Sequence, residues 1–302
     1  MIEELKNKKI KINISPTEQI IVKYNTKIRD VLSLLDMEEK DILAVRVNNS
    51  IRNLDYALCE NSHMAPVKYN DADGHRIYIR TVKFMLYMAL KRLYPTLDIE
   101  VCNMQGGIIY FICQNGEFTN DMAVELLKEM RTIVKNDSKF ERKLTTYEEA
   151  KYLFELSKND DVLDSMAIRM SPHITIHICE NMYGLADGIL APSASYTPDF
   201  DIKKFRRGFA LIVPEQDNKN IMSKVEDNPL YSVFEERSDF LDVIKVRSIS
   251  ELNSKVIDGS IKDVIHVNEA EQNRRFAELI LDIKAKSSSI TRRQLKLFQI
   301  RL

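Results

Sequence analysis

Two histidines stand at a spacing that zinc sites use. His173 and His177 are four residues apart, as in the His-x-x-x-His pairs that bind zinc from one face of a helix. The residues between them, Ile-Thr-Ile, alternate between apolar and polar types, which predicts a strand. Residues four apart on a strand share a face but lie about 13 Å apart, too far to share one metal ion. We therefore expect two ordinary strand histidines, and we expect the isolated His63, His75 and His266 at surface or turn positions.

Motifs for the common kinds of catalysis do not occur in the sequence. We find no Gly-x-x-x-x-Gly-Lys-[Ser/Thr] phosphate loop, no Gly-x-Ser-x-Gly and no Gly-x-Gly-x-x-Gly. The four cysteines (Cys59, Cys102, Cys113 and Cys179) form no Cys-x-x-Cys pair, and Cys59 and Cys179 have no recognisable activating base. We therefore predict no catalytic residue, no metal and no cofactor, and a binding protein rather than an enzyme.

Two groups of basic residues are candidates for binding anions. The first is Arg76, Arg80 and Lys83, and the second is Lys203, Lys204, Arg206 and Arg207. Clustered Lys and Arg side chains neutralise phosphates, and the aromatic Phe205 and Phe209 beside the second group can stack on bases. The alternative for both groups is a solvated charged edge, which is common on protein surfaces.

The N-terminal residues predict a small sheet with one helix. Ile10, Ile12 and Ile14 alternate with polar residues, which predicts a strand, and further strands are expected at 19–24, 43–47 and 51–54. A turn at 15–18 joins the first two strands, and Asn48-Asn49 joins the last two. Thr26 is expected to cap a helix whose apolar residues follow at helical spacing. Two strands, a helix and two strands predict a β-grasp unit.

The central residues predict a second mixture of helices and strands. An apolar face from Val82 to Leu93 predicts a helix that Pro95 ends, and Gly106-Gly107 predicts a hairpin between strands at 98–103 and 108–113. Two further helices are expected, one capped by Thr119 and one opened by the capping box of Thr146 and Glu149. We expect a polar loop at 158–161 and strands at 174–178 and 209–213.

The last third of the chain is predicted to be helical. Residues 217–220 are typical of a linker, and helices are expected at 230–241, 249–257 and 268–286, followed by a poorly ordered basic tail. Hydrophobic residues make up 44% of the chain and charged residues 29%, with a net charge of −1, which is typical of a folded soluble protein. No apolar run is long enough to span a membrane and no signal peptide is recognisable, so we expect a cytoplasmic protein without a membrane partner.

The sequence resembles the N-terminal region of threonyl-tRNA synthetases. Residues 8–68 resemble their TGS domain, with the matching stretch Ala44-Val-Arg-Val-Asn48 followed by Leu54-Asp55. The segment from Arg80 to Pro95 resembles the first long helix of the synthetase editing domain, and Gly188, four residues before Pro192, resembles its second motif. The likeness covers residues 8 to about 214. It implies an α+β fold with a TGS-like β-grasp domain at 1–70, an editing-like α+β domain at 71–216, and a helical connecting segment with a basic tail at 217–302.

A further resemblance is to bacterial nucleoside kinases of the uridine kinase and phosphoribulokinase type, which carry such a region ahead of the kinase domain. The stretches that match their connecting region are Phe140-Glu141-Arg142, Asn228 to Phe234, Val246-Arg247 and Ser250 to Asn253. In those proteins a phosphate loop follows, whereas this sequence ends at Leu302 without one. The resemblance therefore implies the pre-kinase half of such a protein.

The synthetase resemblance also places a candidate site. The two metal-binding pairs of the editing domain fall here on Arg80 with Phe84 and on Ala186 with Leu190, none of which binds zinc. The resemblance implies that Arg80 faces Asp187 and Gly188 across the former editing pocket. A guanidinium there can hold a phosphate or carboxylate, and the Phe84 ring can face a base. We expect an anion-binding pocket with Lys203, Lys204, Arg206 and Arg207 at its rim; the alternative is that Arg80 pairs with Asp187 and the pocket has closed.

Three functions are compatible with these residues. The first is a non-catalytic regulatory module that binds RNA, such as tRNA, or a nucleotide, or that serves a kinase domain in trans. The second is a hydrolase of mischarged tRNA that uses residues unlike those of the family, and the missing zinc ligands argue against it. The third is a fragment of a nucleoside kinase, and the missing phosphate loop argues against it.

Overall fold

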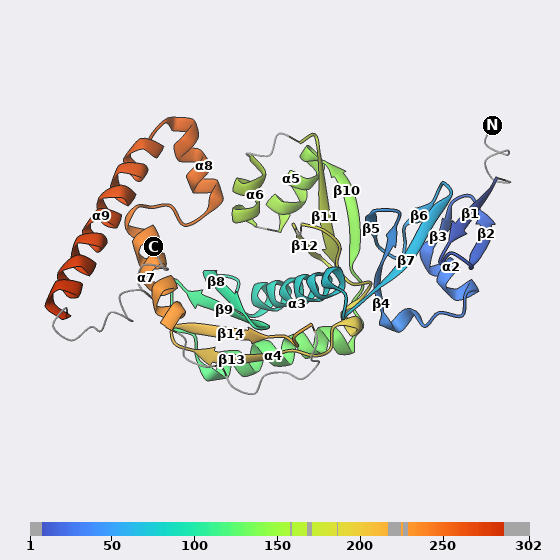
Figure 1. Ribbon diagram of the computed structural model, residues 1–302, viewed down its shortest axis with the longest axis horizontal. Helices are drawn as coiled ribbons and strands as arrows, with labels where there is room; N and C mark the ends of the chain where they lie inside the picture. The colour runs from blue at the N-terminus through green and yellow to red at the C-terminus, as the bar shows by residue number, and fades with distance from the viewer. Residues whose placement is uncertain are drawn as a thin grey trace. The chain divides into compact units, whose positions relative to one another are not determined.

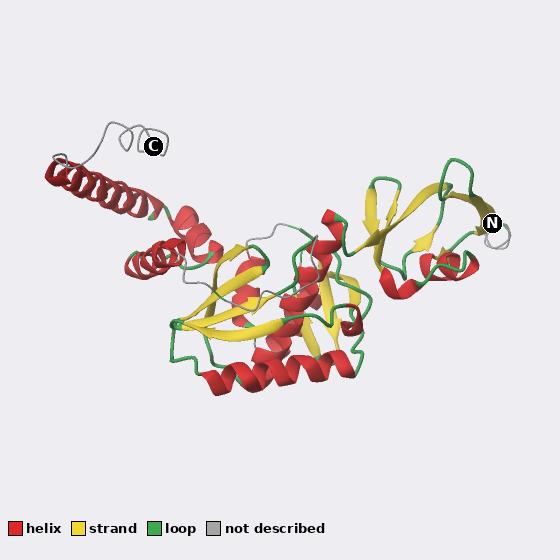
Figure 2. Ribbon diagram, turned by 60° about the horizontal axis from the view of Figure 1, so that its bottom comes forward, coloured by secondary structure: helices red, strands yellow, loops and turns green. Residues whose placement is uncertain are grey.

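The computed structural model describes residues 8–157, 159–167, 171–185, 187–216, 225 and 229–286. The chain divides into two compact units, the first ending at Glu235 and the second beginning at Glu236. Sheets and helices are both present, as expected for an α+β fold (Figures 1 and 2). No helix among the described residues is long and apolar enough to cross a membrane.

The N-terminal part of the first unit is a mixed sheet in the order β2-β1-β7-β4-β5, in which β1 runs parallel to β7. Its elements are β1 (Lys9–Asn13), β2 (Gln19–Lys23), β3 (Thr26–Lys27), α2 (Ile28–Leu34), η1 (Glu39–Asp41), β4 (Ile42–Val47), β5 (Ser50–Arg52), β6 (Ala57–Leu58) and β7 (Ser62–Lys68). The alternation of Ile10 and Ile12 with polar residues buries one face of β1 against Val31 and Leu32 of α2. This sheet with one helix agrees with the expected elements, although β3, β6 and β7 were not predicted.

Thr26 does not cap α2, so that prediction is wrong. The Thr26 hydroxyl donates to the Lys23 carbonyl at 2.7 Å, and Thr26 pairs with Leu58 in the short strand β3. The N-cap position belongs to Lys27, whose side chain makes no capping bond. The Ile28 and Arg29 amides instead donate to the backbone carbonyls of Tyr56 and Leu54, so a distant loop satisfies the helix start.

The central part is built on an antiparallel sheet in the order β13-β14-β9-β8. The elements on this sheet are α3 (Ala72–Leu93), β8 (Ile99–Gln105), β9 (Ile108–Cys113), α4 (Asn120–Lys135), η2 (Ala194–Tyr196), β13 (Asp201–Phe205) and β14 (Gly208–Ile212). Phe111 on β9 packs with α3 and α4 on one face, and Tyr110 packs with Tyr231 of α7 on the other. Burial on both faces explains why β9 is apolar at every position. The predicted hairpin at Gly106-Gly107 and the Thr119 cap of α4 are confirmed.

A second sheet in the central part has the order β10-β11-β12 and packs with two helices. Its elements are β10 (Glu141–Thr146), α5 (Tyr147–Leu156), α6 (Asp160–Ala167), β11 (His173–Cys179) and β12 (Met182–Gly184). Thr146 caps α5 as predicted, but the predicted loop at 158–161 is wrong because α6 starts at Asp160. Asn159 is buried and donates to the Tyr87 hydroxyl at 2.6 Å. This tertiary contact holds the polar residues at the start of α6.

The C-terminal helices are α7 (Pro229–Val243), α8 (Ile249–Asp258) and α9 (Ile261–Lys286). They confirm the three expected helices, and α9 begins seven residues earlier than the predicted position 268. Ser248 and Glu251 form a capping box at α8, and Gly259 ends it in the left-handed conformation. The predicted linker at 217–220 and the tail from Ser287 lie outside the described residues.

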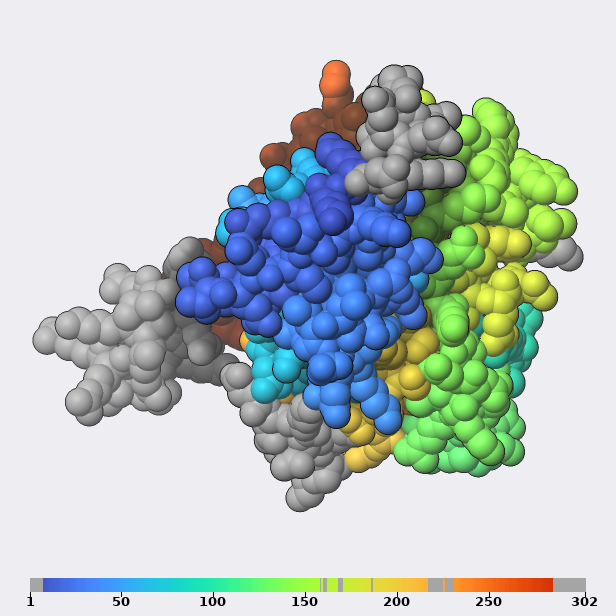
Figure 3. Space-filling model, turned by 90° about the vertical axis from the view of Figure 1, so that its right-hand side faces the viewer, coloured from blue at the N-terminus to red at the C-terminus, as the bar shows by residue number. Residues whose placement is uncertain are grey.

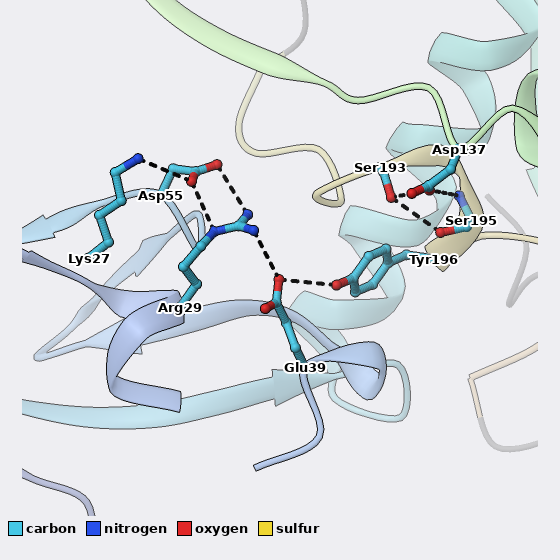
Figure 4. A network of polar contacts seen from close by, with 8 residues as sticks. All are labelled: Lys27, Arg29, Glu39, Asp55, Asp137, Ser193, Ser195 and Tyr196. Atoms are coloured by element: carbon cyan, nitrogen blue, oxygen red, sulfur yellow. Dashed lines mark hydrogen bonds and ion pairs between the residues drawn. The ribbon is translucent and has the colours of Figure 1, made fainter. Parts of the chain in front are cut away.

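Polar contacts join the N-terminal sheet to the central part within the first unit. Glu39 of η1 accepts from the Tyr196 hydroxyl at 3.3 Å and pairs with Arg29 at 3.5 Å, and Arg29 also binds Asp55 (Figure 4). The two parts present adjoining surfaces in the space-filling view, where the blue N-terminal residues lie against the green and yellow residues of the central part (Figure 3).

Candidate functional site

A cavity of about 660 Å³ lies beside α3, which runs between the two sheets of the central part (Figure 1). Its cationic wall comes from one helix, because Arg76, Arg80 and Lys83 are four and three residues apart and therefore project from one face of α3. Its apolar wall is formed by Ile79, Phe84, Tyr87, Met104, Val162 and Leu185. An apolar cavity with a few convergent charges is the usual form of a small-molecule site.

Arg80 lies against the Gly188 loop, as the synthetase resemblance implied. Its Nη1 donates to the Ile189 carbonyl at 2.9 Å. A Cβ added to Gly188 would stand 2.9 Å from the Arg80 Cζ, and Gly188 has a φ of 106°. Burial lowers the pKa of Arg80, and the nearby Asp187 carboxylate partly offsets this effect. The cavity beside Arg80 remains open, so the contact between Arg80 and the Gly188 loop does not close it.

Lys83 lies one turn further along the same wall. Its surroundings desolvate the ammonium group and lower its pKa, and the Arg80 charge lowers the pKa further. The positive charges of Arg80 and Lys83 repel each other, so an anion bound beside them would stabilise both charged side chains.

Phe84 does not offer the open ring face that was expected. Its side chain is only 6% exposed, and its ring contacts Phe140 edge-to-face with centroids 5.7 Å apart. A Cβ on Gly184 would lie 2.6 Å from the ring, so the close approach of β12 depends on this glycine. Phe84 is therefore part of the apolar wall and not a free platform for stacking.

The two strand histidines lie in different environments. Both are on β11 as predicted, but His173 is exposed whereas His177 is 1% exposed. The His177 Nε2 lies 2.9 Å from the Gly188 carbonyl oxygen, so this side chain helps to hold the loop opposite Arg80. Among the residues that the structure describes, no three His, Cys, Asp or Glu side chains gather as a metal site would require. Of the positions that the resemblance aligns with zinc ligands, Leu190 is buried in the core, and Ala186 lies outside the described residues.

The cysteines are poorly suited to act as nucleophiles. Cys113 and Cys179 are buried and unpaired, Cys102 is half-buried, and Cys59 is exposed. Burial raises the pKa of Cys102 and of Cys179 to about 11, which keeps both thiols protonated at neutral pH.

The second basic group does not line the cavity beside α3 and instead contacts α7, so its expected place at the pocket rim is wrong. Lys203 and Lys204 lie on β13, and Arg206 and Arg207 form the turn to β14. Arg206 binds Glu235 of α7 at 2.7 Å and lies over the Tyr231 ring at 4.9 Å. The pairing of β13 with β14 places this turn against α7. The residue types and their spacing in the sequence did not reveal this contact.

A second cavity of about 250 Å³ was not predicted. It is lined by Arg76 and Arg80 of α3, by Arg52 of β5 and by Arg142 of β10, together with Asp73. Arg52 and Arg142 are far from α3 in the sequence, and only the tertiary structure brings them to it. No local pattern marks either residue as part of a site.

Comparisons with known proteins agree with part of this picture. No family model matches the chain. The threonine–tRNA ligase of Desulforamulus reducens is 28% identical over 141 residues, which are 46% of this chain and 22% of that protein. The threonine–tRNA ligase of Clostridium kluyveri is 23% identical over 239 residues, which are 78% of this chain and 37% of that protein. The enzyme of Wolbachia sp. subsp. Brugia malayi is 22% identical over 189 residues, or 62% of this chain and 30% of its own.

These matches support a threonine–tRNA-ligase-like region over much of the chain. The chain spans well under half the length of these relatives. The resemblance to nucleoside kinases has no support among them and stays a prediction.

Proposed function

We propose that this chain is a non-catalytic module that binds RNA or a nucleotide through the cavity beside α3. The resemblance to threonine–tRNA ligases supports a tRNA-like ligand, and the TGS-like and editing-like assignments of the first unit belong to the same proposal. A kinase domain acting in trans is a further partner that the kinase resemblance suggests.

The observation that carries the proposal is the position of Arg80. By the resemblance, Arg80 aligns with a metal-ligand histidine, and in the structure it lies against Gly188 and beside Asp187 at an open cavity. A guanidinium has no open coordination site and stays protonated, so it cannot activate water as a zinc ion does. It binds phosphate through paired, charge-assisted hydrogen bonds. The chemistry at this position favours binding over hydrolysis.

Calorimetric titration tests the proposal. Nucleoside monophosphates and a short RNA would be titrated at moderate salt into the wild type, Arg80→Ala and a control, Arg131→Ala. Arg131 is an exposed residue of α4 that lines neither cavity. Because a partly buried charge-assisted contact is lost, Arg80→Ala should weaken binding about tenfold or more, whereas the control should bind as the wild type does. Unchanged binding by Arg80→Ala, or no binding at all by the wild type, would contradict the proposal.

A further inference from the structure

The second cavity collects guanidinium groups from three separate segments of the chain. Arg52 comes from β5, Arg76 and Arg80 from α3, and Arg142 from β10. These segments belong to the N-terminal sheet, the central helix and the three-stranded sheet, all within the first unit. A cavity of about 250 Å³ between them holds groups of the size of phosphate rather than a whole nucleoside with its phosphates.

The charges around this cavity are only partly neutralised. Among the described residues, Asp73 is the carboxylate that lines it, and it already binds Arg46 at 2.6 Å and Arg76 at 2.9 Å, whereas Asp187 beside Arg80 lines the larger cavity. The Arg52 guanidinium lies over the Tyr56 ring, 4.6 Å from its centroid. Among the described residues, no carboxylate forms an ion pair with Arg52 or with Arg142. Guanidinium groups that face one cavity without matching carboxylates repel each other, and a bound polyanion would remove this cost.

The two cavities share part of their walls. Arg76 and Arg80 line both of them, so a ligand in the larger cavity has its charged end next to the smaller one. The larger cavity has the apolar residues that suit a base and sugar, whereas the smaller one is lined by four arginines together with Ile51, Ile77 and Ile189.

We propose that the combined site takes a nucleoside 5′-triphosphate, with the nucleoside in the larger cavity and the terminal phosphates among Arg52, Arg76 and Arg142. This inference rests on the proposed function and specifies the ligand of the same site. Several phosphates in a row match the convergent arginines better than an RNA backbone does, because RNA carries one phosphate per nucleotide and would have to pass through the smaller cavity.

The test compares ligands of increasing phosphate number. ATP, AMP and inorganic triphosphate would be titrated into the full chain without added metal ion, at one fixed salt concentration. ATP should bind about tenfold or more tightly than AMP, and inorganic triphosphate should compete with ATP. Arg52→Gln and Arg142→Gln should each weaken ATP about tenfold and leave AMP within about twofold. Arg131→Gln serves as the control.

The outcomes separate this inference from the proposed function. If AMP binds through Arg80 but ATP binds no more tightly, and neither glutamine variant changes ATP binding, the inference is wrong and the proposed function stands. If neither AMP nor RNA nor ATP binds, both are wrong. Because Arg52 packs on Tyr56, its variant is checked by thermal unfolding, and the exposed Arg142 gives an independent result if Arg52→Gln unfolds.

Discussion

At the scale of single residues, Gly188 determines how closely Arg80 can approach the loop. Because Gly188 has a φ of 106° and an added Cβ would lie 2.9 Å from the Arg80 Cζ, a side chain there would strain the backbone and displace the guanidinium. The backbone conformation of Gly188 and its lack of a side chain therefore allow the Arg80 guanidinium to lie against the loop.

We predict that Gly188→Ala weakens nucleotide binding by displacing Arg80, and that it destabilises the fold by roughly 1–3 kcal/mol. The matched control is Gly259→Ala, because Gly259 also has a positive φ, 82°, but an added Cβ there meets nothing within 4 Å. The control should lose stability through backbone strain and keep its affinity. Titration calorimetry and urea unfolding measure both effects, and equal loss of affinity in the two variants would contradict the role of Gly188.

Cys179 gives a prediction about alkaline pH. Burial raises the pKa of its thiol from 9.0 to about 11, so the folded chain keeps a proton that the unfolded chain releases. The resulting contribution to the unfolding free energy is complete below about pH 9 and is lost as the pH rises toward 11. Between these pH values, the unfolding free energy of Cys179→Ala should therefore fall by roughly 1–2 kcal/mol less than that of the wild type. Urea unfolding at a series of pH values measures the difference, and parallel curves for the two proteins would refute it.

At the scale of elements, α7 is held to the four-stranded sheet by Tyr231. The side chain is 1% exposed and packs between Tyr110 and Phe205, with ring centroids 5.5 Å and 4.8 Å away. Arg206 in the hairpin turn adds a contact with the Tyr231 ring and an ion pair with Glu235. The basic hairpin therefore serves to fix a helix.

We predict that Tyr231→Ala costs about 3–5 kcal/mol in the unfolding free energy of the first unit, because it leaves a cavity under α7. Tyr152→Ala is the matched control, since Tyr152 on α5 is 63% exposed, and it should change stability by no more than about 0.5 kcal/mol. Chemical unfolding followed by tyrosine fluorescence and circular dichroism compares the two. A cost for Tyr231→Ala as small as that of the control would show that α7 is not anchored in this way.

At the scale of the molecule, the candidate site depends on how the N-terminal sheet meets the central part. The contact of Glu39 with Tyr196 (Figure 4) and the ion pair between Arg46 and Asp73 both cross this junction. The second cavity lies at the same junction, because Arg52 comes from one side and Arg142 from the other. A site of this kind exists only when both parts are folded and joined.

Features that depend on neighbours within a few residues could be predicted from the amino-acid sequence. The helical spacing from Val82 to Leu93 with Pro95 behind it, the Thr119 cap, the hairpin at Gly106-Gly107 and the strand through His173 and His177 all follow from local periodicity, capping and turn chemistry. The sequence also placed Arg80 beside Gly188, but only through a family resemblance that supplied the missing long-range information.

Features in which distant segments compete for the same residues could not be predicted and appear only in the folded chain. The polar residues predicted to form a loop lie at the start of α6, where Asn159 donates a hydrogen bond to the Tyr87 hydroxyl. Thr26 does not cap α2, because backbone carbonyls of the loop near Tyr56 accept from the first amides of that helix. The arginine cavity depends on Arg52 and Arg142, which are separated by 90 positions in the sequence and are joined only by packing. Local sequence patterns do not predict such contacts, because the contacts form between residues that come together only when the chain folds.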